Sequence, residues 1–163
     1  MDNRYNRHNR RKYNLKVHIV LVTKYRKQLL KDSIADDVKQ KIFDIANAYG
    51  YEIIAIETDK DHIHFLLSYD TTDRVCDIVK IVKQETTYYL WHKYGSLLSK
   101  QYWKKKIFWS DGYFACSIGE VSSTTIQKYI VGYTDVYFYT GGIVENESDF
   151  ATSLDNWEIC SQW

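Results

Sequence analysis

Two histidines separated by one residue, His62 and His64, are the side chains of this sequence best suited to metal chemistry. Val, Ile, Phe and Leu dominate the residues on either side, so the segment is expected to form a β-strand. Residues i and i+2 of a strand share one face, so both imidazoles point the same way while Ile63 points into the core. Two neutral imidazoles supply half of the ligands of a divalent-metal site. The alternative is that they only pair with carboxylates across the sheet.

A metal held by this pair would suit reactions at a phosphodiester. Mg²⁺ and Mn²⁺ prefer oxygen ligands, and His62 and His64 together with a substrate phosphate would form a Lewis-acid site. Transfer of the phosphoryl group also needs a nucleophile, for which Ser, Cys and Tyr are the candidates. Tyr129 stands out because it lies on an expected short helix after the last expected strand. Most of the 15 tyrosines, however, are expected to pack rather than react.

The segments that must position these residues alternate between strand and helix patterns. Strand patterns cover 13–23, 51–58, 62–69 and 114–118, and helix patterns cover 33–49, 72–94 and a third segment that begins at 122 or 123. The order β-α-β-β-α-β predicts an α+β, ferredoxin-like (RRM-like) fold, in which helices cover one face of an antiparallel sheet. The open face would display the two histidines, and a C-terminal helix would carry Tyr129.

The ends of the first two helices carry recognisable signals. Ser33 is expected to cap the start of the first helix, because its side chain can accept a hydrogen bond from a free backbone N–H. Thr72 or Asp73 is expected to open the second helix. Gly50 and Gly95 are expected to end the two helices.

Positive charge is concentrated near the N-terminus of a chain whose net charge is only +1. Residues 1–31 contain ten Lys or Arg and one acid, whereas residues 132–163 contain six acids and neither Lys nor Arg. The basic segment suggests a surface for a polyanion such as DNA, and a solvated basic arm is the alternative. The candidate phosphate contacts are Arg11, Lys12, Lys24 and Arg26.

The chain of 163 residues fits one domain with a substantial core. We expect a basic arm over 1–12, the folded domain over 13–134 and a C-terminal tail of unknown role over 135–163. The three cysteines are scattered without a CxxC pair, which predicts neither a zinc ribbon nor a disulfide framework and fits a cytoplasmic protein. No run of about 18 apolar residues occurs, so no membrane span is expected.

Four segments of this sequence resemble, in order and spacing, the TnpA family of HUH-type single-tyrosine transposases. That family belongs to small bacterial insertion sequences of the 200/605 type. The letters HUH stand for histidine, bulky hydrophobic residue, histidine, which here are His62, Ile63 and His64. The resemblance covers about residues 13–131. The matching segments are Thr58-Asp59-Lys60-Asp61-His62-Ile63-His64, 16–20 with 24–26, 112–119 and 126–130. This spread argues against a simple RRM-like binding module.

The resemblance implies an enzyme that binds imperfect hairpins in single-stranded DNA at the ends of its element. It would cleave one strand, leave a 5′-phosphotyrosine and a free 3′-OH, and then rejoin strands. Tyr129 would be the nucleophile, and His62 and His64 would hold Mg²⁺ or Mn²⁺. The resemblance also implies a homodimer in which the histidine pair and the tyrosine helix of each active site come from different protomers. Such a protein would be found in the bacterial cytoplasm, on the nucleoid when bound to DNA.

One position departs from the family pattern. The family has a Gln four residues after the tyrosine as a third metal ligand, and this chain has Tyr133, a phenol that is a poor ligand for Mg²⁺. Two alternatives therefore stay open: an impaired or non-catalytic relative that binds single-stranded nucleic acid, and a domesticated transposase that acts on chromosomal repeats. The lead-in Asp59-Lys60-Asp61 looks more like the mobile-element branch than the domesticated one.

Overall fold

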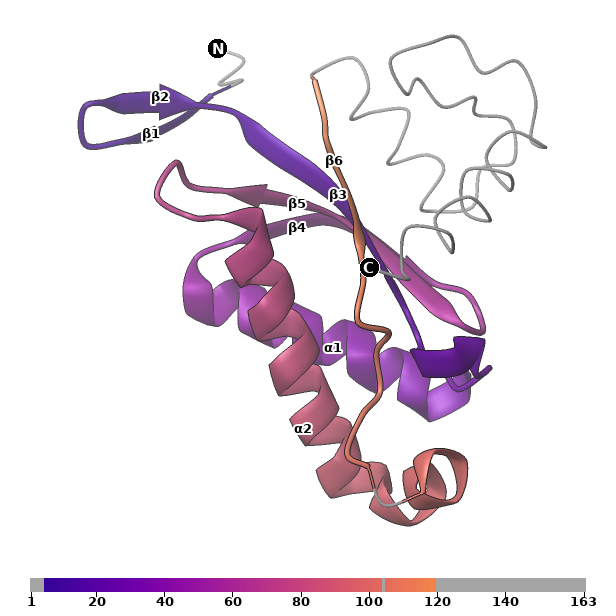
Figure 1. Ribbon diagram of the computed structural model, residues 1–163. Helices are drawn as coiled ribbons and strands as arrows, with labels where there is room; N and C mark the ends of the chain where they lie inside the picture. The colour runs from indigo at the N-terminus through magenta and orange to yellow at the C-terminus, as the bar shows by residue number, and fades with distance from the viewer. Residues whose placement is uncertain (1–4, 104, 120–163) are drawn as a thin grey trace, which may run out of the picture.

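The computed structural model describes residues 5–103 and 105–119 of the chain (Figure 1). Six strands, one 3₁₀ turn and two long helices follow one another along these residues. They are β1 (Asn6–His8), β2 (Arg11–Tyr13), β3 (Leu15–Val22), η1 (Lys24–Arg26), α1 (Asp32–Tyr49), β4 (Glu52–Thr58), β5 (His62–Tyr69), α2 (Val75–Tyr102) and β6 (Phe114–Ser117).

The main sheet has four strands in the order β4-β5-β3-β6, and each neighbouring pair is antiparallel. Both helices lie on one face of this sheet, as Figure 1 shows. This is the ferredoxin-like arrangement that the sequence pattern predicts, so the predicted fold class is confirmed. The predicted C-terminal helix with Tyr129 lies outside the described residues.

Alternation along the strands separates a core face from an open face. Odd-numbered residues of β3 and β5, such as Ile19, Leu21 and Phe65, are fully buried against the two helices. Even-numbered residues, such as His18 and His64, therefore point to the opposite face of the sheet. The strand pattern thus places the histidines on the side that the helices leave uncovered.

Helix α1 has the apolar face that its spacing predicts, and Ile34, Val38 and Ile42 are buried. Gly50 ends the helix as predicted: it adopts a left-handed conformation with φ of 78° and donates its N–H to the Ala46 carbonyl. The predicted cap at Ser33 is wrong, because the helix begins one residue earlier and has no side-chain cap at its start.

Helix α2 differs from the prediction at both of its ends. It begins at Val75 rather than Thr72 or Asp73, and it runs through Gly95 to Tyr102 with a kink at Tyr94. A glycine inside a helix costs about 1 kcal/mol. Burial of two side chains beyond it, Leu98 and Tyr102, outweighs that cost.

Strand β4 contains a bulge where its pairing with β5 shifts between Ile53 and Ala55. Ile53 packs against the main core, whereas Ile54 and Ala55 both pack in a small cluster around Leu66 on the opposite face. The extra residue restores the alternation so that Glu57 is the cross-strand partner of His64.

Residues 6–13, within and beside the segment expected as a basic arm, fold into the β1–β2 hairpin with a two-residue turn. Asn9 occupies the turn with φ of 53°, a conformation that asparagine tolerates better than most residues. The carboxylate of Asp70 anchors the hairpin, because it accepts hydrogen bonds from Arg11 at 2.9 Å and from the Tyr13 hydroxyl at 3.0 Å and lies 3.3 Å from His8. Desolvation alone would raise the Asp70 pKa, but hydrogen bonds from the Thr71 hydroxyl, from Tyr13, from the Thr72 N–H and from His8 lower it to about 2.

Candidate active site

His62 and His64 lie on the open face of β5 with their ring centroids 5.9 Å apart. Val22 and Val20 of β3 are their cross-strand partners. The spacing that predicts a shared face is therefore realised, and two imidazoles are close enough to face one bound group.

A carboxylate orients the first of these imidazoles. His62 Nδ1 lies 2.8 Å from Asp61 Oδ1, and because a carboxylate only accepts, Nδ1 carries the hydrogen and donates it. The Nε2 lone pair of His62 is then the one that can bind a metal. The second Asp61 oxygen is 3.5 Å from the Arg26 guanidinium, so the same carboxylate also ties the turn after β3 to the histidine pair.

The second imidazole lies in a more buried place. Burial, and then the neighbouring His62, lower the pKa of His64 to about 4, while Glu57 and Asp59 act in the opposite direction. His64 is consequently neutral at physiological pH, which is the state that metal coordination requires. Glu57 itself stays ionised: burial would raise its pKa, but the Thr58 N–H and the Lys39 ammonium together lower it.

A third histidine that the sequence analysis did not single out, His18 of β3, belongs to the same face. Its ring centroid is 6.0 Å from that of His64 and 6.1 Å from that of Phe114. Burial, and then the repulsion that a protonated His18 would meet from a protonated His64, lower the His18 pKa to about 4. The alternation of residues 16–22 could have predicted this position, because it places His18 on the face of the sheet opposite Val17 and Ile19.

The residues present fit a divalent metal as two of its ligands. Two imidazoles share a face, one has its tautomer fixed by Asp61, and the other is held neutral by burial. Across residues 5–103 and 105–119, no group of three or more His, Cys, Asp or Glu could hold a metal ion. The remaining ligands would have to come from substrate, water or another part of the chain.

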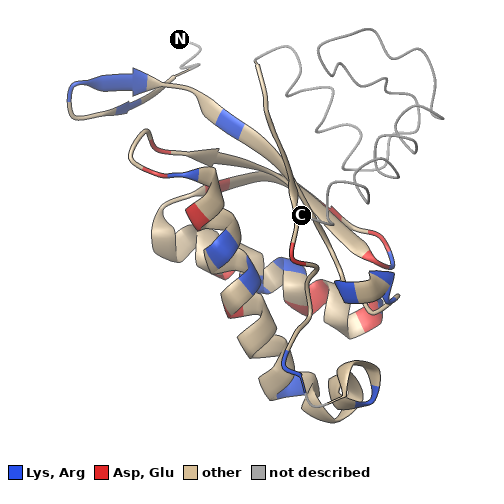
Figure 2. Ribbon diagram, viewed as in Figure 1, with Lys and Arg blue, Asp and Glu red and all other residues tan. Residues whose placement is uncertain are grey.

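The four predicted DNA contacts fall into two groups, separated by the length of β3, which is about 25 Å. The first group, Arg11 and Lys12, lies on the N-terminal hairpin (Figure 2). Arg11 is bound to Asp70 and to the Thr71 hydroxyl, so it holds the hairpin in place. Lys12 is exposed, with its ammonium 4.5 Å from the centroid of the Tyr5 ring.

The second group, Lys24 and Arg26, lies in η1 at the histidine end of β3. Lys24 forms an ion pair with Asp111 at 2.5 Å, and Arg26 pairs with Asp61. The structure therefore brings this group, but not Arg11 and Lys12, near the histidine pair. Tyr129 and Tyr133, like the tail 135–163, lie outside the described residues.

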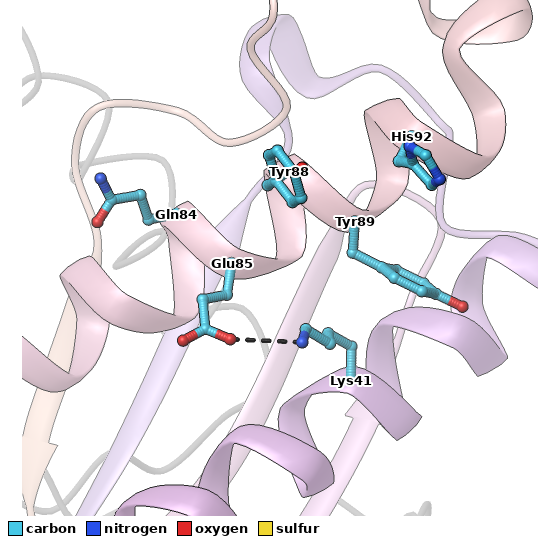
Figure 3. A pocket seen from close by; sticks show the side chains of 6 residues that line it. All are labelled: Lys41, Gln84, Glu85, Tyr88, Tyr89 and His92. Atoms are coloured by element: carbon cyan, nitrogen blue, oxygen red, sulfur yellow. Dashed lines mark ion pairs between the residues drawn. The ribbon is translucent and has the colours of Figure 1, made fainter.

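A separate hollow of about 550 Å³ lies on the helix layer and contains neither His62 nor His64 (Figure 3). Helices α1 and α2 line it with Lys41, Gln84, Glu85, Tyr88, Tyr89 and His92. An ion pair of 3.3 Å between Lys41 and Glu85 crosses it. The hollow contains none of the residues predicted for the site.

No helix of the described segments is long and apolar enough to cross a membrane.

The family model described as "Transposase IS200 like" matches residues 11–132, well over half of the chain. The chain belongs to the IS200-like transposase family. The match includes the histidine strand, the turn after β3 and the segment that holds Tyr129. The family resemblance found in the sequence is thereby confirmed.

Among curated proteins, this IS200-like transposase is similar to the ISDra2 transposase TnpA of Deinococcus radiodurans. The two are 34% identical over 118 residues, which cover 72% of this chain and 83% of the relative. It is also similar to the transposase of the IS200 element of Salmonella typhimurium, with 29% identity over 122 residues that cover 73% and 76% of the two chains.

Two solved structures resemble this transposase. One, from Deinococcus radiodurans R1, was solved as a candidate transposase: it has a TM-score of 0.65 and 29% identity, and the match covers 77% of this chain and 95% of that one. The other is a REP-associated tyrosine transposase bound to a REP hairpin, with a TM-score of 0.55, 16% identity, and coverage of 77% and 70%. At that identity the second likeness shows the fold alone.

Proposed function

We propose that this IS200-like transposase cleaves and rejoins single-stranded DNA at hairpins that mark the ends of its element. Membership of the family supports DNA transposition, and one structural observation carries the mechanism. His62 and His64 present two imidazoles on the open face of the sheet, with Asp61 fixing the tautomer of the first. This arrangement suits a phosphodiester substrate that completes the coordination of a metal.

The proposed reaction uses Tyr129 as the nucleophile. Its phenolic oxygen attacks the scissile phosphorus, the bond from phosphorus to the 3′ oxygen breaks, and a 5′-phosphotyrosine forms. The phenol proton passes to solvent and the departing 3′ oxygen takes up a proton. Attack by a 3′-OH on the phosphotyrosine reverses these steps and rejoins a strand.

His62 and His64 would hold Mg²⁺ or Mn²⁺, which when bound would polarise the phosphate and stabilise the charge on the departing oxygen. The neutral state of His64 supports this role, because a protonated imidazole has no lone pair to offer. Asp61 holds the His62 ring in one orientation through its 2.8 Å contact.

We infer that the working form is a homodimer. The proposed mechanism has one nucleophilic tyrosine per chain, and an element with two ends requires two cleavages. In the composite arrangement, Tyr129 of one protomer would act beside His62 and His64 of its partner. Mixing a Tyr129→Phe chain with a His64→Ala chain tests this: activity should return in the mixture, whereas two inactive proteins that stay inactive together would contradict shared sites.

A covalent-capture assay tests the central proposal. The full chain would be incubated with labelled single-stranded DNA from both ends of its element and with Mg²⁺ or Mn²⁺, then separated on a denaturing gel. We expect a protein–DNA adduct that is absent with EDTA and in the Tyr129→Phe variant. An adduct that persists in Tyr129→Phe would overturn the assignment of the nucleophile, and no adduct with any metal would overturn strand transfer.

A second candidate function is supported by Tyr133, which stands where the family has a Gln ligand. In that case the protein would bind hairpins but cleave them poorly. Comparison of the wild type with Tyr133→Gln separates the two candidates. A large gain of adduct in Tyr133→Gln would support an impaired enzyme, and equal adduct yields would contradict it.

A further inference from the structure

The turn η1 that follows β3 displays one aromatic ring to solvent. Tyr25 is 72% exposed, although tyrosine is a residue that folded proteins usually bury in large part. It adopts φ of 61° and ψ of 23°, and the next residue, Arg26, has φ of 49°. Two consecutive left-handed residues, neither of them glycine, persist only where the surrounding structure holds them.

Several hydrogen bonds from different elements hold this turn. Thr23, which is fully buried, donates its N–H to the Asp61 carbonyl at 2.9 Å and its hydroxyl to the Lys27 carbonyl at 2.7 Å. Lys24 donates its N–H to the Phe108 carbonyl at 2.8 Å, and its own carbonyl accepts from the Tyr102 hydroxyl at 3.1 Å. The exposed ring of Tyr25 thus projects from a backbone that is held by hydrogen bonds to the β4–β5 loop, to α2 and to the segment between α2 and β6.

The two cations that flank Tyr25 are already engaged by acids. Lys24 pairs with Asp111, and Arg26 pairs with Asp61. The Lys24 ammonium also lies 5.6 Å from the centroid of the Tyr25 ring. The turn therefore presents to solvent a broad aromatic surface with partly neutralised charge around it, which is a surface suited to a base more than to a phosphate.

The turn adjoins the histidine pair. Asp61 contacts Arg26 on one side and His62 on the other, and Val22, which immediately precedes Thr23, is the cross-strand partner of His62. Figure 1 shows the turn at the end of β3, beside the loop that joins β4 and β5. A strand whose phosphate lies at the histidines would place a neighbouring nucleotide within reach of Tyr25.

We propose that Tyr25 is a stacking platform for an unpaired base beside the phosphate that the histidines bind. This inference rests on the proposed single-stranded DNA substrate and adds a residue that positions it. Exposed aromatic rings beside phosphate contacts are the means by which proteins hold single strands, because every base offers a face for stacking. The fixed backbone of the turn holds the point from which the ring projects, so binding has to order only the side chain of Tyr25.

The test compares binding of two probes to the full chain by fluorescence anisotropy. One probe is an oligothymidylate of about 20 nucleotides, and the other is an abasic strand with the same number of phosphates. We expect Tyr25→Ala to weaken oligothymidylate binding about tenfold and to leave abasic binding unchanged, while Tyr25→Phe binds like the wild type. Tyr25→Asn should behave like Tyr25→Ala, and because asparagine accepts the left-handed backbone, it removes the ring without disturbing the turn.

Tyr88→Ala is the matched control, because Tyr88 is 77% exposed but lies on α2 in the helix layer. It should bind both probes like the wild type. Wild-type affinity of Tyr25→Ala for oligothymidylate, or an equal loss for both probes, would overturn stacking by Tyr25.

The binding readout does not depend on cleavage, so this proposal and the proposed function can fail separately. A covalent adduct together with normal oligothymidylate binding by Tyr25→Ala would retain strand transfer and remove the stacking role. Base-dependent binding lost in Tyr25→Ala, without any adduct in the wild type, would retain the stacking role and remove strand transfer.

Discussion

Replacing Asp61 with asparagine should weaken metal binding while leaving the fold intact. Asp61 Oδ1 accepts from His62 Nδ1 at 2.8 Å, and asparagine can still accept this hydrogen bond through its side-chain oxygen. The variant therefore removes the negative charge behind the imidazole more than it removes the contact. Loss of that charge makes the imidazole a weaker donor to a metal.

The size of the effect follows from the surroundings of Asp61. Changes to a group that orients a metal ligand typically cost 10–100-fold in affinity, which is about 1.4–2.7 kcal/mol. The Asp61 side chain is 23% exposed and shares its charge with Arg26, so solvent and the guanidinium already weaken its pull on His62. We therefore expect the lower end, about a tenfold rise in the Kd for Mn²⁺.

Calorimetric titration of the full chain with Mn²⁺ near neutral pH would measure this. Asp59→Asn is the matched control, since it removes the same charge from the same turn and its carboxylate accepts from the Lys60 N–H at 2.6 Å. His62→Ala removes a whole ligand, so it should raise the Kd for Mn²⁺ more than Asp61→Asn does. Equal Mn²⁺ affinity in the wild type and Asp61→Asn would refute the orienting role. Unchanged affinity in His62→Ala would refute the metal site itself.

Three further predictions concern contacts that hold the scaffold. Lys83→Met should lower the free energy of unfolding by about 2 kcal/mol in urea titrations. The Lys83 ammonium donates to the carbonyls of residues 110, 111 and 112 at 2.8, 3.0 and 2.6 Å, and these bonds would be lost. Lys80→Met, a change at an exposed position of the same helix, should alter the free energy of unfolding little. Burial lowers the Lys83 pKa from 10.5 to about 8. The unfolded chain therefore binds more protons between these values, and the stability of the wild type relative to Lys83→Met should rise with pH across that interval; a flat or falling difference would contradict this. The pKa of Asp70 lies below its ordinary 3.8, so its anchoring of the β1–β2 hairpin should be lost as pH falls toward 2. Asp70→Ala, which removes both acceptor oxygens, should release the hairpin at neutral pH. NMR shifts of residues 6–13 that stay unchanged would contradict both.

Much of the fold could be predicted because the β-strands carry clear alternation. The pattern of β3 and β5 places Ile19 and Phe65 in the core and the histidines on the opposite face, and one register satisfies both. Local signals were less reliable where tertiary packing opposed them. Gly95 has the local character of a helix end, yet the burial of Leu98 extends α2 past it.

Only the part of the site that lies on one strand could be predicted from the sequence. The spacing of His62 and His64 was enough to place two imidazoles on one face. That His18 and Glu57 lie beside His64 depends on the register between strands and on the bulge in β4, and neither can be read from one segment of sequence. Likewise, a count of basic residues could not show that Lys24 has an acidic partner 87 positions later in the chain.

The bulge in β4 has a consequence for how the length of this strand can vary. Ile54 is the residue without a counterpart on β5, and its removal would convert the pairing into an uninterrupted ladder. Glu57 would still stand opposite His64, and Ile53 and Ile56 would still face the helices. A deletion of Ile54 should therefore preserve the sheet, which amide exchange in β4 and β5 would report. An added residue next to Glu57, by contrast, would turn that carboxylate toward the core. Loss of one residue in this strand is thus easier to accommodate than gain of one.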